Sequence, residues 1–225
     1  MIKRVPTGIP GLDGLLQGGL VDNSAVLVTG ETGTGKTIFG SQFLWHGIQK
    51  GDSGVYISLE ESPQEIKDDV ATFGWDFEKY EKKGLLKMIY HDPAQVDKIG
   101  TVIQNEIREV KASRLVMDST AAMALAIENP GLIRRRIAGI VNTIKRYQKC
   151  TALIMTEVPE DSKLLSRFGV EEFVTDGIIV LNYLGMGEGT TRSLMIRKMR
   201  RTNHGKDVYP MKINDSGIHI GKGSL

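Results

Sequence analysis

The stretch SAVLVTGETGTGKT, residues 24–37, joins an apolar strand pattern to a glycine-rich loop and the start of a helix. The run SAVLVTG (24–30) is short, rich in valine and closed by glycine, which is typical of a strand buried on both faces. GETGTGKT, Gly30 to Thr37, fits the pattern G-x-x-x-x-G-K-[ST] in full. With a strand before it and a helix after it, this loop is predicted to bind nucleotide phosphates through converging backbone N–H groups.

Two side chains of the loop have the expected chemistry. Lys36 would place a cation at the β- and γ-phosphate oxygens, and Thr37 would offer its hydroxyl to Mg²⁺. The alternative is a glycine-rich turn with a lysine present by chance. The flanking strand and helix patterns favour the nucleotide site.

Beyond this stretch, apolar strand patterns alternate with helix patterns. We expect strands at 54–59, 86–90, 114–119 and 151–156, and helices from Lys36 to about Gln49, after the capping box of Ser62, Pro63 and Glu65, at 97–110, and after Asn129 and Pro130. After Asp176 the chain changes to short strand-like runs separated by turn residues. This order predicts an α/β fold with a mostly parallel central sheet flanked by helices and with C-terminal antiparallel hairpins.

Composition is ordinary for a globular protein. The 225 residues are 40% hydrophobic and 25% charged, without repeats or a clear linker, so we expect one domain over residues 1–225. The only cysteine, Cys150, excludes an intramolecular disulfide framework and is expected to be a buried, reduced thiol. No export signal or membrane span is recognisable, so we expect a cytoplasmic protein that does not contact the membrane.

Carboxylates follow two of the predicted strands. Asp118 ends the apolar strand RLVM, where a Walker-B acid would hold the metal, although a helix N-cap aspartate is the alternative. Glu60 and Glu61 close the strand VYISL. Adjacent carboxylates at a strand end are costly unless a metal, water or cation uses them, so one of the two is a candidate catalytic base. The alternative is that both are solvated residues before a capped helix.

Six segments in the same order resemble a KaiC-type ATPase of the RecA-like superfamily. They are TGIPGLDGLLQGGL, GETGTGKT, SLEESPQEI, VMDS, SRFGVEEFVTDGIIVL and KMRRTNHGKDVYPMKI. The resemblance runs from Val5 to about Ile220, which is the length of a single KaiC domain. It implies Mg-dependent ATP hydrolysis in a homo-oligomeric ring, typically a hexamer, with ATP between subunits and a regulatory or signalling output to a protein partner that remains unknown.

The resemblance also implies a set of site residues. The catalytic set would be Glu60, Glu61, Lys36, Lys198 and Arg200, and the metal set Thr37 and Asp118. The ATP-binding set would be Gly30, Thr32, Gly33, Thr34, Gly35, Lys36, Thr37, Ile38, Thr72, Lys198, Met199, Arg200, Thr202, His204, Asn214 and Asp215. Thr156 and Glu157 would sit where RecA-like proteins sense the γ-phosphate.

The stretch IRKMRRTNHGK, residues 196–206, is the densest basic cluster in a chain of net charge +2. Strand alternation predicts that Lys198 and Arg200 point to one side and that Arg197, Met199 and Arg201 point to the other. In the resembling family, the corresponding lysine and arginine reach the γ-phosphate of the neighbouring subunit.

Four further residues, Thr202, His204, Asn214 and Asp215, would line the base and ribose side of the same trans pocket, and Thr72 would act in cis. Arg201 stands where the family usually has glycine, so either the backbone bend after Arg200 or the close approach of a ligand is expected to differ. The alternative for the whole cluster is an edge strand made basic to discourage aggregation.

Nucleic acid binding is the main alternative function. The loop STAAMALAIENPG contains no Lys or Arg, and VPEDSKLLSRFGVEEF carries Lys163 and Arg167 against four acids, Glu160, Asp161, Glu171 and Glu172. Such loops would not attract phosphates, so we expect no nucleic acid partner, although the run 134–136 leaves one possible arginine patch. Autophosphorylation is a second alternative, but SRFGVEEFVTDG resembles the family's non-phosphorylated type of domain.

Overall fold

The computed structural model describes residues 2–160, 162, 164–184 and 191–223. The first half of the chain contains β1 (Arg4–Val5), α1 (Leu12–Leu15), β2 (Leu20–Val21), β3 (Ala25–Gly30), α2 (Lys36–Gln49), β4 (Gly54–Ser58), α3 (Pro63–Ala71), α4 (Phe77–Lys82), β5 (Leu86–Tyr90), the 3₁₀ helix η1 (Pro93–Lys98) and α5 (Ile99–Glu109). The second half contains β6 (Arg114–Asp118), the 3₁₀ helix η2 (Thr120–Leu125), α6 (Pro130–Arg146), β7 (Thr151–Glu157), α7 (Glu171–Val174), β8 (Gly177–Leu184), β9 (Thr191–Met199), β10 (Val208–Asn214) and β11 (Gly217–Ile220).

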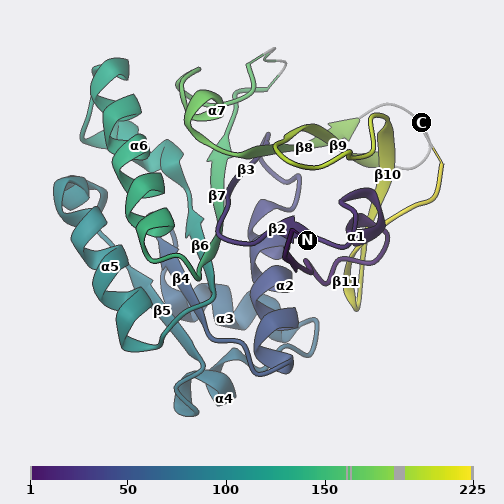
Figure 1. The fold of residues 1–225 in the computed structure, drawn as a ribbon, viewed down its shortest axis with the longest axis horizontal. Helices are drawn as coiled ribbons and strands as arrows, with labels where there is room; N and C mark the ends of the chain where they lie inside the picture. The colour runs from purple at the N-terminus through teal and green to yellow at the C-terminus, as the bar shows by residue number, and fades with distance from the viewer. Residues whose placement is uncertain (1, 161, 163, 185–190, 224–225) are drawn as a thin grey trace.

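A nine-stranded sheet forms the centre of the fold (Figure 1), in the order β11-β10-β9-β8-β3-β7-β6-β4-β5. The six strands from β8 to β5 are mutually parallel, whereas β9, β10 and β11 continue the sheet as antiparallel neighbours. The expected α/β class, with a mostly parallel sheet and C-terminal hairpins, is confirmed. Because parallel strands end at one edge, the loops after β3, β4, β6 and β7 meet there.

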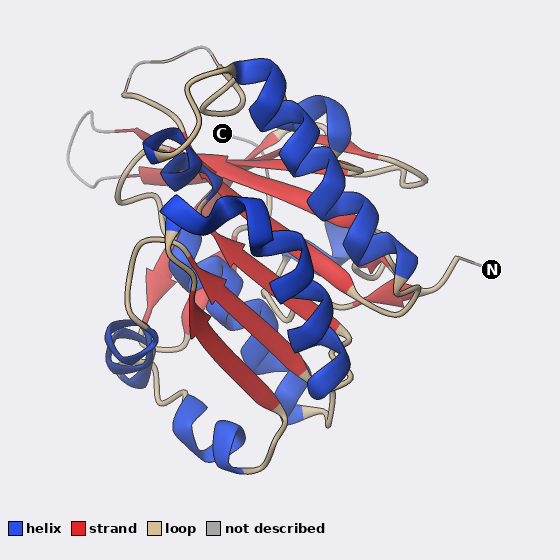
Figure 2. Ribbon diagram, turned by 90° about the vertical axis from the view of Figure 1, so that its left-hand side faces the viewer, coloured by secondary structure: helices blue, strands red, loops and turns tan. Residues whose placement is uncertain are grey.

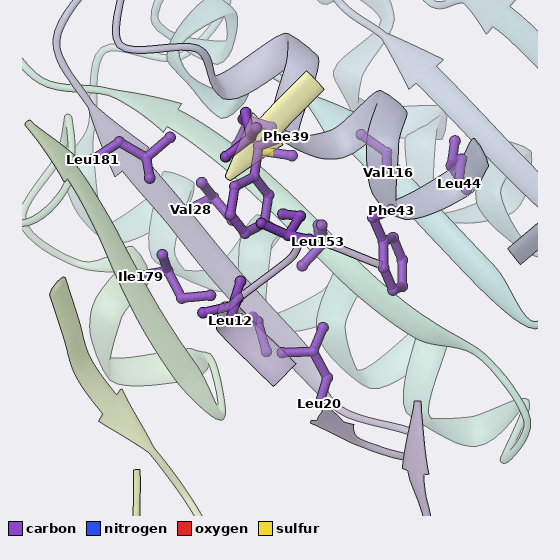
Figure 3. Packing of buried hydrophobic residues seen from close by; sticks show 14 of the residues in the cluster. Leu12, Leu20, Val28, Phe39, Phe43, Leu44, Val116, Leu153, Ile179 and Leu181 are labelled. Carbon is purple, nitrogen blue, oxygen red and sulfur yellow. The ribbon is translucent and has the colours of Figure 1, made fainter. Parts of the chain in front are cut away.

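Helices cover both faces of the sheet. Figures 1 and 2 show α5 and α6 side by side along one face, and α2 lies against the other. Beneath α2, Phe39 and Phe43 pack among Val28, Leu153 and Ile179 (Figure 3). A second buried cluster lies under α5 and α6 and includes Cys150, the expected buried free thiol. The central strands β3, β4, β6 and β7 are therefore buried on both sides, as their continuous apolar patterns predict.

Helix boundaries follow the capping signals. Ser62 and Glu65 form the reciprocal capping box at the start of α3, and Asn129 caps α6 with Pro130 in the first turn. Of the expected helix at 97–110, residues Ile99–Glu109 form α5, and the two residues before them end the 3₁₀ helix η1. Within the described residues, none of the helices combines the length and the apolar character needed to cross a membrane.

The basic cluster begins at the end of β9. Strand β9 is not an edge strand, because β8 pairs with it on one side and β10 on the other. Only its end, residues 196–199, extends past the registered pairing with β10. Arg197 and Lys198 lie in this end without a β10 partner, so a basic edge that discourages aggregation stays an alternative for them.

Candidate functional site

The phosphate loop lies at the carboxyl edge of the parallel strands, between β3 and α2. Gly33 and Gly35 adopt positive φ angles of 76° and 99°, conformations that a residue with a side chain rarely takes. A Cβ atom at Gly35 would also approach Ile213 Cδ1 to 2.9 Å. The loop therefore needs glycine at this position for its backbone conformation and for close packing.

Lys36 is the cation of the loop. Its side chain is 7% exposed, and Nζ donates to the carbonyl oxygens of Gly30 and Glu31 at 3.1 and 2.9 Å. The carboxylate of Glu157, at the end of β7, lies 3.2 Å from the same nitrogen. The ammonium group is thus held over the loop by short contacts that phosphate oxygens could replace.

Asp118, the candidate metal ligand, lies at the end of β6 beside Thr37. Its Oδ2 accepts hydrogen bonds from the Thr37 hydroxyl at 2.9 Å and from the Tyr56 hydroxyl at 2.7 Å. Burial raises the pKa of the Asp118 carboxyl, against the two hydroxyl donors, which lower it. The alternative role as a helix N-cap is wrong, because Ser119 is the residue that precedes η2.

Glu60 and Glu61 are both exposed just after the end of β4. Of the two, Glu60 is the one that bonds to the residue following β6, the strand that ends at Asp118. The Ser119 hydroxyl donates to Glu60 Oε1 at 2.7 Å. Burial raises the pKa of Glu60, and the charges of Glu157 and Asp118 raise it further. Burial and then the charge of Asp118 also raise the pKa of Glu61. The raised pKa values fit carboxylates grouped around a site that binds cations.

Thr156 and Glu157, the two candidate γ-phosphate sensors, face opposite sides of the sheet. Glu157 contacts Lys36 of the phosphate loop. The Thr156 hydroxyl turns away and donates to the buried carboxylate of Glu171 at 3.2 Å. Of the two, Glu157 is therefore the residue beside the loop.

Four other predicted ligands lie in or near the same region. Thr32 is exposed on the loop, the Thr34 hydroxyl donates to the Glu31 carbonyl oxygen at 2.8 Å, and Ile38 packs partly buried against the core under α2. Thr72 ends α3, where its hydroxyl donates to the Asp69 carbonyl oxygen at 2.6 Å. Their contacts with a nucleotide stay predictions.

Lys198 and Arg200 both contact residues in α7 or directly after it. Lys198 Nζ donates to the carbonyl oxygens of Glu172 and Thr175 at 2.9 and 2.7 Å, and Arg200 Nη1 lies 3.6 Å from Asp176 Oδ1. Burial, and then the charge of Arg200, lowers the pKa of the Lys198 ammonium group. Met199 is buried in the opposite face beneath α2.

The remaining residues of the predicted trans pocket are separated by the length of β10. Thr202 and His204 lie before β10, where the Thr202 hydroxyl accepts from Arg4 Nη1 at 2.6 Å and His204 is half-buried. Asn214 and Asp215 lie after it, about 20 Å along the strand direction. The four residues therefore form two groups at opposite ends of β10, and their shared contact with one nucleotide stays a prediction.

The turn that carries Asn214 and Asp215 is close to the phosphate loop of its own chain. Ile213, the preceding residue, and Ile218 are the side chains nearest to Gly35. Asn214 and Asp215 are exposed beyond them. These two residues thus lie on the phosphate-loop side of the sheet of their own chain, whereas Thr202 and His204 follow Lys198 and Arg200 at the other side.

Arg192 is a site residue that the sequence did not indicate. From β9, its guanidinium group donates twice to the Gly33 carbonyl oxygen, at 3.2 Å each, and stacks over the Tyr183 ring at 4.9 Å from its centroid. It occurs in no motif. Its position follows only from the length of β9, which places Arg192 at the phosphate-loop edge of the sheet and Lys198 at the other end.

The possible nucleic acid contacts gain no support. Arg134 stacks on Phe173 at 5.4 Å, and Arg136 pairs with the carboxylate of Asp97, so two of the three arginines at 134–136 make contacts within the chain. Of the second loop's charges, Asp161 and Lys163 lie outside the described residues.

The protein supplies only part of the oxygen ligands that a magnesium ion needs at this site. Within the part of the chain that the structure describes, no cluster of three or more His, Cys, Asp or Glu side chains forms a ready metal centre. Thr37 and Asp118 supply one hydroxyl and one carboxylate in contact with each other. Mg²⁺ in nucleotide sites is commonly held by one or two protein oxygens together with substrate phosphates, so the donor set fits.

The fold and the site together define a P-loop nucleotide-binding protein of the RecA-like class. A family model described as "ATPase: KaiC" matches residues 5–224, and the chain belongs to this KaiC ATPase family of ATP-binding proteins. A crystal structure of a KaiC-like protein from Pyrococcus horikoshii is similar, with a TM-score of 0.89 and 39% identity, over 98% of this chain and 100% of that one.

Two curated relatives show the range of the similarity. A UPF0273 protein of Pyrococcus furiosus is 37% identical over 98% of this chain and 94% of its own length. The circadian clock oscillator protein KaiC of Thermostichus vulcanus is 35% identical over 97% of this chain. The chain spans only 44% of that clock protein, in line with a resemblance to one KaiC domain.

Proposed function

We propose that this protein hydrolyses Mg-ATP at contacts between identical subunits arranged head to tail in a ring, and that the ring has a regulatory or signalling output. Lys36 and the loop amides bind the phosphates, and Thr37 and Asp118 hold the metal ion. The ion, when bound, neutralises charge on the phosphate oxygens. Glu60, fixed by Ser119, orients the attacking water for in-line displacement at the γ-phosphate.

The observation that supports shared sites is the position of Lys198 and Arg200 on the sheet. Gly30 pairs with Leu181 of β8, but Met199 pairs with Gly177, which is in register with Val26. Four residues of strand separate the phosphate loop from the level of Met199, about 13 Å. The two cations belong to the amino edge of the parallel strands, and the nucleotide belongs to the carboxyl edge.

This arrangement favours a head-to-tail contact between copies. If the amino edge of one subunit meets the carboxyl edge of the next, each phosphate loop receives two cations from its neighbour. A contact between two different surfaces of the same chain closes into a ring when the rotation permits. Cations supplied in this way stabilise charge that develops on the transferred phosphoryl group.

The test uses two variants that are each inactive for a different reason. Arg200→Ala is expected to lower turnover by up to roughly a thousandfold while the phosphate loop still binds ATP. Lys36→Ala is expected to lose ATP binding but to keep its cations. A mixture of the two should recover turnover, because the loop of the first chain then meets the cations of the second.

Arg197→Ala is the matched control, because Arg197 is an exposed arginine at the irregular point of β9. It should retain turnover close to that of the unmodified protein. The proposal is wrong if Arg200→Ala hydrolyses ATP at the normal rate, or if the mixture stays as inactive as its components.

A further inference from the structure

Helix α7 connects two parts of the chain that act in different sites under the proposed function. Its first residue, Glu171, accepts a hydrogen bond from Thr156 near the end of β7 at 3.2 Å. The carbonyl oxygens of Glu172 and Thr175 accept hydrogen bonds from Lys198 at the end of β9. This short helix thus lies between the strand beside the phosphate loop and the cation that would serve the neighbouring subunit.

Glu171 is unusual because its carboxylate is fully buried. Besides Thr156, the backbone N–H groups of Phe168 and Val170 donate to its Oε2 at 3.3 and 3.2 Å. Among the described residues, no lysine or arginine forms an ion pair with it. Burying a carboxylate costs free energy unless hydrogen bonds compensate, so three neutral donors keep Glu171, and with it the start of α7, in one position.

The end of β7 contacts the phosphate loop and α7 at once. Glu157 pairs with Lys36 on one face, and its neighbour Thr156 bonds Glu171 on the other. Consecutive strand side chains point to opposite faces, so a displacement of this strand end moves both contacts. Because bound phosphate would compete with Glu157 for Lys36, such a displacement is coupled to the nucleotide.

The two cations depend on the segment at the other end of α7. Lys198 is held by two carbonyl oxygens of residues 172 and 175, and Arg200 faces Asp176. Asp176 is itself fixed, because it accepts from the backbone N–H of Ala25 at 3.0 Å and pairs with Lys145 at 2.7 Å. A shift of α7 therefore changes how Lys198 and Arg200 are presented.

We propose that Glu171 is a positioning residue which, through α7, sets where Lys198 and Arg200 meet the neighbouring subunit's nucleotide. Nucleotide at one phosphate loop then alters catalysis in the next site around the ring. This inference rests on the proposed function, because it requires the cations to act in trans.

The test places one substitution in either of two chains. In a mixture of Lys36→Ala chains, which donate cations, and Arg200→Ala chains, which bind ATP, turnover arises where the two kinds of chain meet. Glu171→Gln added to the cation-donating chain should lower the recovered turnover roughly tenfold, because small misplacements of catalytic groups are costly. The same substitution in the ATP-binding chain should lower it less than about twofold.

Glu172→Gln is the matched control. It removes the same charge one residue away, where the side chain accepts from Ser166 instead, and it keeps the carbonyl oxygen that Lys198 uses. It should change the recovered turnover less than about twofold in either chain. If Glu171→Gln does not fold, as judged by thermal melting, Thr156→Val removes the same hydrogen bond from the other side and replaces it in the test.

The outcomes separate the two proposals. If Glu171→Gln lowers the recovered turnover equally in either chain, the role of Glu171 is a general structural one. This result overturns the inference but not the proposed function. Recovery that is unaffected in both chains also overturns it while the proposed function stands. A mixture that recovers no turnover even without Glu171→Gln refutes the proposed function, and the inference falls with it.

Discussion

Among single residues, Arg114 is the largest fully buried side chain and ties the N-terminal segment to the sheet. Its Nη1 donates to the carbonyl oxygens of Pro6 and Phe43 at 2.8 and 3.0 Å, and its Nε pairs with Asp52 at 2.9 Å. The guanidinium also lies over the Phe43 ring. A planar group with several donors is required to satisfy three acceptors in one place.

We expect Arg114→Met to lower the free energy of unfolding by about 3 kcal/mol, because two carbonyl oxygens and one carboxylate lose their partner. Urea unfolding measures the change. Lys87→Met is the control, since it breaks an ion pair with Glu109 in which both side chains are more than a third exposed, and it should cost less than about 1 kcal/mol. Equal losses in the two variants would contradict this account of Arg114.

Asp118 illustrates the opposition between stability and activity at one residue. Burial raises its pKa in the folded protein, so the charged form is disfavoured relative to the unfolded chain. The folded chain then binds more protons than the unfolded chain between the two pKa values. Stability is therefore unaffected below the unfolded pKa, near 3.9, and falls as the pH rises through the higher folded pKa.

Asp118→Asn removes this penalty and can still accept the hydroxyl groups of Thr37 and Tyr56. We expect it to raise the free energy of unfolding at pH 7 by roughly 0.5–2 kcal/mol and to abolish ATP turnover. The gain should shrink as the pH approaches 4. Urea unfolding at several pH values, without nucleotide, measures it, and a gain that is constant or grows toward low pH would refute the assignment.

Arg201 stands where the family usually has glycine, and it adopts a φ of 59°, the left-handed conformation that glycine favours. Whether the bend differs from that of the family stays a prediction. The Arg201 carbonyl oxygen accepts from Arg4 Nη2 at 3.0 Å. The sequence could not reveal this, because the contact joins residues 197 positions apart.

Among the elements, those that local patterns specify were predicted best. Strands such as β3 and β6 have continuous apolar runs, and α3 and α6 have capping residues, so their positions follow from the sequence. The elements β1, β2 and α7 have two to four residues, too few to show a period. Their existence depends on tertiary contacts.

The candidate site divides in the same way. Lys36 and Thr37 were predicted from the phosphate-loop pattern and Asp118 from the apolar strand that it ends, and the structure brings Thr37 and Asp118 into contact. The positions of residues on the late strands were harder to predict. A motif that is continuous in sequence runs along β9 to one edge of the sheet and returns along β10 to the other. For this reason the position of Arg192 beside the phosphate loop was missed, and only the family resemblance grouped Asn214 and Asp215 with Thr202.

The turn between β10 and β11 therefore gives a prediction that distinguishes cis from trans contacts. Asp215→Ala should weaken ATP binding roughly three- to tenfold even in dilute protein, where chains are separate, because the turn lies beside its own phosphate loop. Thr202→Ala should leave that binding unchanged. Fluorescence titration with an ATP analogue measures both, and equal effects of the two substitutions would place the residues in one pocket again.

For the whole molecule, the proposed ring makes turnover depend on protein concentration. Turnover per chain should rise with concentration and then level off, and light scattering should show a higher mass with Mg-ATP than without. Turnover that is the same at all concentrations in a monomeric protein would refute shared sites. Mass that instead increases with the length of added single-stranded DNA would favour a recombinase-like filament.

The surface around the donated cations suggests which side chain strengthens that assembly. Phe173 is 61% exposed next to Glu172, whose carbonyl oxygen binds Lys198. Large aromatic side chains contribute much of the binding energy when an interface covers them. We expect Phe173→Ala to raise the concentration for half-maximal turnover roughly tenfold, equivalent to about 1.4 kcal/mol of association free energy. Tyr90→Ala should not, although Tyr90 is 49% exposed, because it ends β5 at the far side of the sheet. If both substitutions shift the curve equally, the contact between subunits is not where Lys198 and Arg200 are.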